Sequence, residues 1–220
     1  MNLIKILPEI QGRTFVVGDL HGCYDALSDE LKKVSFDFDN DQLLSVGDLV
    51  DRGSQNMRCL RLLHKPWFHA VRGNHDDLVV GGMQGIDAYL NCWMQNGGEW
   101  IRALTESDLD ELGNHLLPKL QELPYVIKFG NLTILHAEVT LDNINDIDIE
   151  DIQMLTWGRS RINSGDTSIV NGTDYIVVGH TPVSSPICVG NHVYIDTGAC
   201  FPSGKLTLIN IDDMPDVPKI

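Results

Sequence analysis

Residues 14–25 read TFVVGDLHGCYD, and this stretch decides the fold class. A short run of apolar and β-branched residues stops at Gly18, and Asp19 and His21 follow at once. Later in the chain the same arrangement returns at 43–48 (LLSVGD), 68–75 (FHAVRGNH), 132–136 (LTILH) and 175–180 (YIVVGH). Short apolar runs without strict alternation predict strands that are buried on both faces.

Helical patterns lie between these predicted strands. Residues 25–34 and 54–64 carry apolar side chains at helical spacing, and 78–120 is helix-like with a break at Gly97 and Gly98. The alternation of strand and helix predicts βαβ units and a partly parallel sheet, with further strands at 192–197 and 205–211. We therefore expect an α/β fold in a single domain, residues 1–220, in which 78–120 forms a helical, lid-like insertion.

Composition narrows the possible functions. The 220 residues carry a net charge of −15, which argues against nucleic-acid binding through the phosphate backbone. No apolar run approaches the roughly 20 residues that cross a bilayer, and residues 1–13 lack the features of a signal peptide. The five cysteines are scattered, as expected of reduced thiols. These features predict a cytoplasmic protein without a membrane partner, and its oligomeric state stays open.

Side chains that can bind metal follow the predicted strands. In open α/β sheets, ligands bind beyond the carboxyl ends of the strands. The side chains expected there are Asp19, His21, Asp48, Asn74, His136 and His180. They are too many for one ion that must also hold water and substrate, so they predict two ions. Asp19 and His21 are assigned to one ion, Asn74, His136 and His180 to the other, and Asp48 to both.

The chemistry of this set indicates the kind of metal. It combines carboxylate, imidazole and amide groups and contains no thiolate, so a structural zinc site is a poor fit. Manganese, iron and zinc suit such oxygen and nitrogen ligands, and nickel or magnesium is an alternative. Two ions can share a hydroxide, lower its pKa and clamp a phosphoryl group for in-line attack.

Three segments resemble the signatures of a known family: GDLHGCYD at 18–25, GDLVDRG at 47–53 and RGNHD at 72–76. They are similar to the phosphoprotein phosphatase (PPP) family of calcineurin-like metallophosphatases. The resemblance is strongest to its bacterial and phage branch, typified by the phage lambda protein phosphatase. It implies a β-sandwich of mixed sheets flanked by helices, activation usually by manganese, and phosphoprotein substrates that carry phosphoserine or phosphothreonine.

The resemblance also implies roles for residues outside the metal set. His75 corresponds to the general acid, oriented by Asp51, and a carboxylate partner keeps an imidazolium charged for proton donation. Arg52 corresponds to the first phosphate-binding arginine. The second is Arg159 by the family pattern, although Arg161 lies close enough in sequence to leave the choice open. The implied mechanism is attack by the metal-bridged hydroxide, without a phosphoenzyme.

Some alternatives and departures remain. Symmetrical diadenosine tetraphosphate hydrolases share the first and third signatures, but they typically read GDLVARG, without the carboxylate of Asp51. A non-catalytic calcineurin-like scaffold is a more distant alternative.

Glu138 stands where the family pattern has Gly or Asp, and we expect it beside His136 or facing solvent. Trp93 and Trp100 are interpreted as core or lid packing. Activity toward phosphotyrosine or phosphohistidine stays open.

Overall fold

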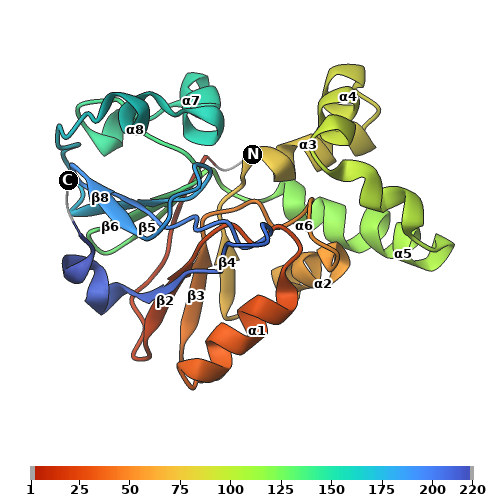
Figure 1. The fold of residues 1–220 in the computed structure, drawn as a ribbon, viewed down its shortest axis with the longest axis horizontal. Helices are drawn as coiled ribbons and strands as arrows, with labels where there is room; N and C mark the ends of the chain where they lie inside the picture. The colour runs from red at the N-terminus through yellow and green to blue at the C-terminus, as the bar shows by residue number, and fades with distance from the viewer. Residues whose placement is uncertain (1–2, 219–220) are drawn as a thin grey trace.

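A computed structural model describes residues 3–218, which form two β-sheets with helices on their outer sides (Figure 1). Four strands form one sheet in the order β10-β2-β3-β4, and six form the other in the order β1-β5-β6-β7-β9-β8. Both sheets contain parallel and antiparallel pairs. The predicted sandwich of mixed sheets is therefore confirmed; residues 1–2 and 219–220 of the predicted domain lie outside the described residues.

The four-stranded sheet is built from the first signature segments. Its strands β2 (Thr14–Val17), β3 (Gln42–Ser45) and β4 (Phe68–Ala70) are parallel, and β10 (Leu208–Asn210) is antiparallel to β2. Since β2, β3 and β4 run in one direction, their carboxyl ends lie at the same edge of the sheet, as Figure 1 shows. That edge carries the residues that follow each strand.

The six-stranded sheet brings the later histidines to the same region. Its central strands β6, β7 and β9 are parallel to one another. The strands are β1 (Ile4–Ile6), β5 (Val126–Phe129), β6 (Leu132–Leu135), β7 (Tyr175–Val178), β8 (Ile187–Val189) and β9 (His192–Tyr194). Two predicted strands, 192–197 and 205–211, are shorter than expected. Beyond their ends, the Thr197 hydroxyl donates to the carbonyl of Lys205 at 2.6 Å, and the backbone N–H of Lys205 donates to the carbonyl of Thr197 at 3.1 Å.

Apolar side chains from both sheets meet between them. Val16 of β2, Leu44 of β3, Ile134 of β6 and Val177 of β7 are all fully buried in one cluster. The neighbouring residue Val17 is also fully buried, but it belongs to the cluster beneath the helices. Strands covered on both faces need apolar residues at successive positions, which explains the absence of strict alternation in the sequence.

Helices cover the outer faces of the sheets. The helices that cover the four-stranded sheet are α1 (Tyr24–Lys33) and α2 (Asn56–Leu60), the latter continued by the 3₁₀ helix η1 (Arg61–His64). A helical segment follows β4 and occupies the right of Figure 1. It comprises α3 (Asn74–Met83), α4 (Asp87–Gln95), η2 (Gly98–Ala103), α5 (Glu106–Glu111), η3 (Leu112–Leu116) and α6 (Leu117–Gln121). Two shorter helices, α7 (Ile152–Trp157) and α8 (Ser160–Ser164), lie at the top of the same view.

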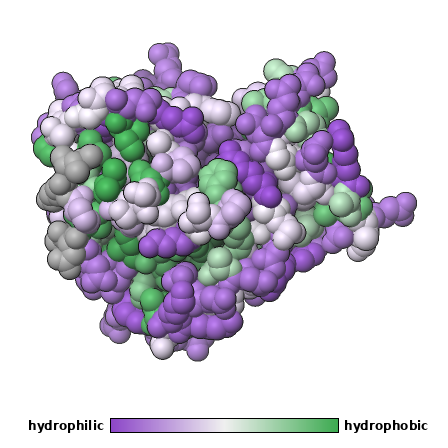
Figure 2. Space-filling view, viewed as in Figure 1, coloured by the Kyte–Doolittle hydropathy of each residue, from purple (hydrophilic) through white to green (hydrophobic). Residues whose placement is uncertain are grey.

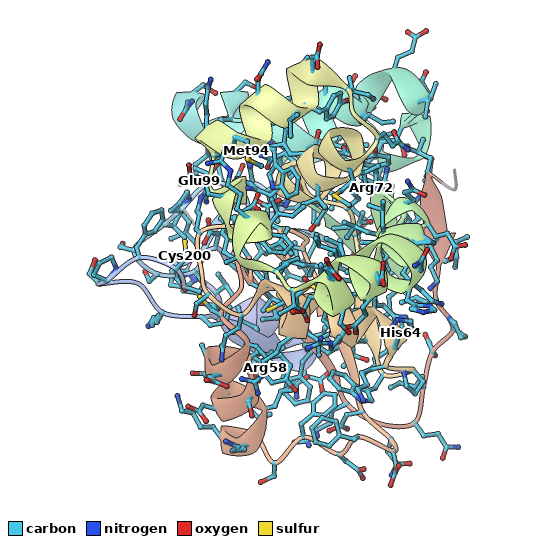
Figure 3. The ribbon with its side chains drawn as sticks, turned by 90° about the vertical axis from the view of Figure 1, so that its right-hand side faces the viewer. Arg58, His64, Arg72, Met94, Glu99 and Cys200 are labelled. Carbon is cyan, nitrogen blue, oxygen red and sulfur yellow. The ribbon has the colours of Figure 1, made fainter. Side chains whose placement is uncertain are left out.

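A buried ion pair joins the beginning and end of the helical segment. Arg72, labelled in Figure 3, is 2% exposed; its guanidinium lies 3.2 Å from Asp77 and donates to the carbonyl of Leu120.

On the outside, hydrophilic residues cover most of the rim in Figure 2, and hydrophobic residues gather near the sheets. Among residues 3–218, no helix combines the length and apolar character that a bilayer crossing requires.

Candidate metal centre and active site

The structure brings the six predicted metal ligands together where the two sheets meet. They follow the ends of five strands: Asp19 and His21 lie in the turn after β2, and the other four follow β3, β4, β6 and β7, one each. Their exposed fractions are no more than 6% for Asp19, His21, Asp48, Asn74, His136 and His180. Buried groups of this polarity require partners or a cation, because burial without either is costly.

Backbone strain is concentrated in the same loops. Among the described non-glycine residues, six have a left-handed backbone, and five of these lie in the site. The five are His21 (φ 40°), Asp48 (φ 49°), Asp51 (φ 73°), Arg52 (φ 66°) and His180 (φ 63°). Such conformations cost about 1–3 kcal/mol each and persist only where the surrounding structure enforces them, which is common at functional sites.

Hydrogen bonds fix which imidazole nitrogens can bind metal. Nδ1 of His21 donates to the carbonyl of Val50 at 2.7 Å, and Nδ1 of His136 donates to that of Val46 at 2.8 Å. Each Nε2 therefore presents a lone pair to the site. Burial lowers the pKa of His21 to about 3 and also lowers the pKa of His136, so both rings are neutral at pH 7.

One group of ligand atoms gathers around Asp48, His136 and His180, whose donor atoms lie within 4.8 Å of one another. Asn74 Oδ1 lies 2.8 Å from His136 Nε2 and 3.0 Å from His180 Nδ1. Among the described residues, His180 Nε2 is buried and has no hydrogen-bond partner. Burial lowers the pKa of His180 to about 3, so this ring is neutral as well.

The other group consists of His21, Asp48 and His75, again with donor atoms within 4.8 Å. Asp19 is not part of either triad; its carboxylate accepts the backbone N–H of His180 at 3.1 Å. This approach depends on Gly179, because a Cβ atom there would lie 1.8 Å from Asp19 Oδ1. Arg52 lies beside this group: one guanidinium nitrogen donates to Nε2 of His21 at 2.7 Å, and the other lies 2.9 Å from Nε2 of His75.

The donor set fits divalent cations. The unprotonated Nε2 atoms of two neutral imidazoles (His21 and His136), the unpartnered Nε2 of His180 and the amide oxygen of Asn74 are all electron donors. The Asp48 carboxylate belongs to both triads, so it can bridge two ions. No cysteine belongs to either triad, which agrees with a mixed oxygen and nitrogen site and not with structural zinc.

His75 and Asp51 form a close pair. Nδ1 of His75 lies 2.6 Å from Oδ2 of Asp51, and Asp51 is fully buried. Burial alone lowers the pKa of His75, but Asp48 and the hydrogen-bonded Asp51 outweigh it, and the pKa lies above its ordinary value. The pair is therefore suited to hold a proton on Nε2 at neutral pH.

The two candidate arginines differ sharply. Arg159 lines a cavity of about 280 Å³ together with Asp48, His75 and His180, and its guanidinium donates to the carbonyl of His180 at 3.1 Å. Arg161 is 2% exposed and donates to the carbonyls of Val139, Asp166 and Ser168. The structure thus puts Arg159 at the cavity and Arg161 in a structural role.

Glu138 does not face solvent, and its hydrogen-bond partners come from α8. It is 2% exposed, and its carboxylate accepts the backbone N–H groups of Ser160 and Arg161 at 2.9 and 2.8 Å, and the Ser160 hydroxyl at 2.6 Å. It therefore fixes the first turn of α8, immediately after Arg159. Exposure to solvent, one of the two expected positions, was wrong because the start of a helix later in the chain supplies partners for the carboxylate.

Several site residues could not be recognised from the sequence. Trp93 and Trp100, expected to serve packing, both donate their indole N–H to Asp51 Oδ1, at 2.8 and 2.6 Å. Asp76 accepts three backbone N–H groups, from Gly73, Asp48 and Leu49. The cavity is also lined by Asn96, Trp157, Pro182 and Phe201. Asp76 ends the third signature, at 72–76, whereas none of the three signatures contains the other residues.

Comparison with known proteins agrees with this geometry. The pattern of the family described as "Calcineurin-like phosphoesterase" matches residues 12–204. The chain is 35% identical to the serine/threonine-protein phosphatase 2 of Salmonella typhimurium, over 96% of this chain and the whole relative. It is 29% identical to an asymmetrical bis(5'-nucleosyl)-tetraphosphatase of Geobacillus thermodenitrificans, over 92% of this chain and 91% of the relative.

A solved structure called a putative diadenosine tetraphosphatase superposes with a TM-score of 0.68 at 21% identity, covering 96% of this chain and 98% of that one. At this identity the likeness concerns the fold. The match over residues 12–204 and the 35% identity to the Salmonella phosphatase show that the chain belongs to the calcineurin-like phosphoesterase family and is a hydrolase.

Proposed function

We propose that this chain is a protein phosphatase that hydrolyses phosphoserine and phosphothreonine monoesters. The observation that carries the proposal is the His75–Asp51 pair, 2.6 Å apart and buried beside the metal ligands. A serine or threonine side chain leaves as an alkoxide, a poor leaving group that needs a proton in the transition state. The proposal agrees with the 35% identity to bacterial serine/threonine-protein phosphatases.

Six residues would hold the two ions: Asp19, His21 and Asp48 the first, and Asp48, Asn74, His136 and His180 the second. When bound, the ions would supply an activated water and the positive charge that a phosphoryl group requires. Manganese is the first choice, and the ligand types also accept iron, zinc, nickel or magnesium.

The chain's own residues would then bind and protonate the substrate. Arg159 lines the cavity and presents a guanidinium that can bind two phosphoryl oxygens. Arg52 now donates to Nε2 of His21 and lies 2.9 Å from Nε2 of His75; a cation held by His21 would replace the first contact and leave the guanidinium available for the phosphoryl group. His75 would pass its Nε2 proton to the leaving oxygen while Asp51 holds Nδ1.

A groove beside the cavity supports a protein substrate. It measures about 410 Å³ and shares Asn74 and Trp157 with the cavity, so the two adjoin each other. Apolar side chains of α3, α4 and α7 line much of it, including Leu78, Tyr89 and Ile152. Such a surface suits residues that flank a phosphoserine, and pockets of this kind are mostly apolar with few polar groups.

The rival is a dinucleoside tetraphosphate hydrolase. The sequence motifs suggested the symmetrical type of this enzyme, whereas the tetraphosphatases of Geobacillus thermodenitrificans and Bacillus cereus to which the chain is similar are of the asymmetrical type. A polyphosphate leaving group is already a weak base and needs no proton, so a buried His–Asp acid would be superfluous in that reaction.

The test compares release of phosphate from a phosphoserine or phosphothreonine peptide with cleavage of diadenosine tetraphosphate, with and without Mn²⁺. His75→Asn should reduce peptide turnover about 100-fold or more, as expected for loss of a general acid. His115→Asn, an exposed histidine on the helical segment, is the matched control and should retain wild-type turnover. Metal-dependent cleavage of the dinucleotide without peptide turnover would refute the proposal. If the peptides are turned over, assays with phosphotyrosine and phosphohistidine substrates define the substrate range of the phosphatase.

A further inference from the structure

The Asp51 carboxylate has more donors than its partnership with His75 requires. Oδ2 lies 2.6 Å from His75 Nδ1, while Oδ1 accepts the indole N–H of Trp93 at 2.8 Å and of Trp100 at 2.6 Å. The backbone N–H of Asp51 donates to Asn56 Oδ1 at 2.8 Å. Each carboxylate oxygen of this fully buried side chain therefore has its own hydrogen-bond partners, and the orientation of the carboxylate is fixed.

The two indoles come from the helical segment, which contributes no predicted ligand beyond its first residues. Trp93 lies in α4 and Trp100 in η2, and their rings meet edge to face with centroids 6.1 Å apart. Trp93 is 1% exposed, so its ring is locked in the core. Two rigid donors aimed at one oxygen prevent the carboxylate from rotating.

The same segment also contacts the backbone of the neighbouring arginine. Asp51 and Arg52 both have a left-handed backbone, at φ 73° and 66°. Gly97, at φ 111°, packs so closely that a Cβ atom there would lie 2.9 Å from Arg52 N and 3.1 Å from Arg52 Cγ. The turn between the tryptophans therefore abuts the strained loop. Met94 and Glu99, labelled in Figure 3, mark this turn.

We propose that Trp93 and Trp100 are positioning residues for the general acid. Their N–H groups hold Asp51 Oδ1 so that Oδ2 faces His75 Nδ1, and the imidazole ring is thereby aimed at the leaving oxygen. This inference rests on the proposed function of His75 as a proton donor. An indole N–H is a donor only and carries no charge, so it orients the carboxylate without neutralising it. An arginine or lysine in the same place would neutralise the carboxylate.

The proton balance is simple. His75 Nε2–H gives its proton to the departing oxygen, and Nδ1–H stays on the ring, hydrogen-bonded to Asp51. Asp51 remains an anion throughout, and both indoles keep their protons. The contribution of the tryptophans is therefore geometric. Their effect on kcat should be larger for a leaving group that needs protonation more.

The experiment removes the N–H groups and keeps aromatic rings. Trp93→Phe, Trp100→Phe and the double variant are assayed with phenyl phosphate, a poor leaving group, and 2,4-dinitrophenyl phosphate, a good one. We expect kcat for phenyl phosphate to fall on the order of tenfold in each single variant, within the range that general acids contribute. For 2,4-dinitrophenyl phosphate, kcat should change less than about twofold, and KM should be unchanged for both.

Two controls separate positioning from folding. Trp67→Phe is the matched substitution, because Trp67 packs on Phe36 and Phe38 outside the site and should alter neither rate. In a His75→Asn background, Trp100→Phe should cause no further loss with phenyl phosphate, since residues that act through one group are non-additive. Trp100 is only partly buried, so this variant remains informative if Trp93→Phe lowers the melting temperature.

The outcomes are distinct. Equal losses on both aryl phosphates, or a full additional loss in the His75→Asn background, would overturn the positioning role and leave the proposed function intact. Leaving-group-selective losses without turnover of phosphoserine peptides would support the positioning role and refute the protein substrate. Selective loss together with peptide turnover supports both.

Discussion

Asn74 Oδ1 lies 2.8 Å from His136 Nε2, and both atoms are electron donors. Nδ1 of His136 is committed to the carbonyl of Val46, so Nε2 has no proton to share. Two buried lone pairs that face each other repel unless a cation lies between them. This contact is the local reason to expect metal-dependent stability as well as metal-dependent activity.

The first prediction concerns metal binding and stability. Mn²⁺ at 100 times its Kd should stabilise the protein by about 2.7 kcal/mol, because it binds the folded state only. The measurement is the melting temperature across a Mn²⁺ titration after chelation with EDTA. His136→Gln removes a ligand of the second ion only, so it should reduce this shift and abolish the activity, and His115→Gln should preserve both. An undiminished Mn²⁺-induced shift in His136→Gln would place the metal elsewhere.

The second prediction concerns pH. A general acid works only while protonated, and the pKa of His75 lies above its ordinary value because of Asp48 and Asp51 despite burial. Turnover of a phosphoserine peptide should therefore be retained at neutral pH and decline as pH rises through that raised pKa.

Asp51→Asn removes one of the charges that raise the pKa and leaves burial, which lowers it. The basic limb of kcat against pH should shift to lower pH in this variant. 2,4-dinitrophenyl phosphate is the control substrate, since its leaving group needs little protonation. The assignment of His75 fails if the limb keeps its position in Asp51→Asn, or if it is equally strong with the control substrate.

The third prediction concerns Glu138. Its carboxylate accepts three hydrogen bonds from Ser160 and Arg161, which fixes the backbone next to Arg159. Glu138→Gln should destabilise the fold by about 2 kcal/mol, because charge-assisted bonds in a buried position are lost. It should also weaken inhibition by inorganic phosphate, measured as Ki, through displacement of Arg159.

An Arg159→Ala background provides the check on this route. There, Glu138→Gln should lower the melting temperature without weakening phosphate inhibition any further, since the two substitutions act on one contact. A second, independent loss of phosphate affinity would show that Glu138 acts on the site by another path.

The fourth prediction concerns the groove. Tyr89, 42% exposed, lines the groove but not the catalytic cavity. Tyr89→Ala should raise KM for a phosphoserine peptide several-fold and leave kcat and KM for phenyl phosphate unchanged. Tyr24→Ala is the control, because Tyr24 lines a separate cavity beside α1. Equal effects on peptide and phenyl phosphate would exclude the groove as the peptide site.

Local sequence was most informative where strand and ligand are adjacent. Val16 and Val17 precede Asp19, and Leu44 precedes Asp48, so a buried strand and the polar group after it appear in one short segment. The helical segment was less informative, because amphipathic periodicity indicates a buried face without naming its partner. Trp93 was thus expected to pack, and the acceptor of its N–H lies 42 residues away in the sequence.

The sequence by itself determined the strands, the ligands that follow them and the family that these patterns resemble, since each depends on a few neighbouring residues. Only the tertiary structure decided that Arg159 and not Arg161 lines the cavity, that Glu138 holds the start of α8, and that two indoles share one oxygen of Asp51. Those outcomes depend on which distant segments the folded chain brings together, because a hydrogen bond requires its two atoms within about 3 Å and carries no signature in sequence spacing.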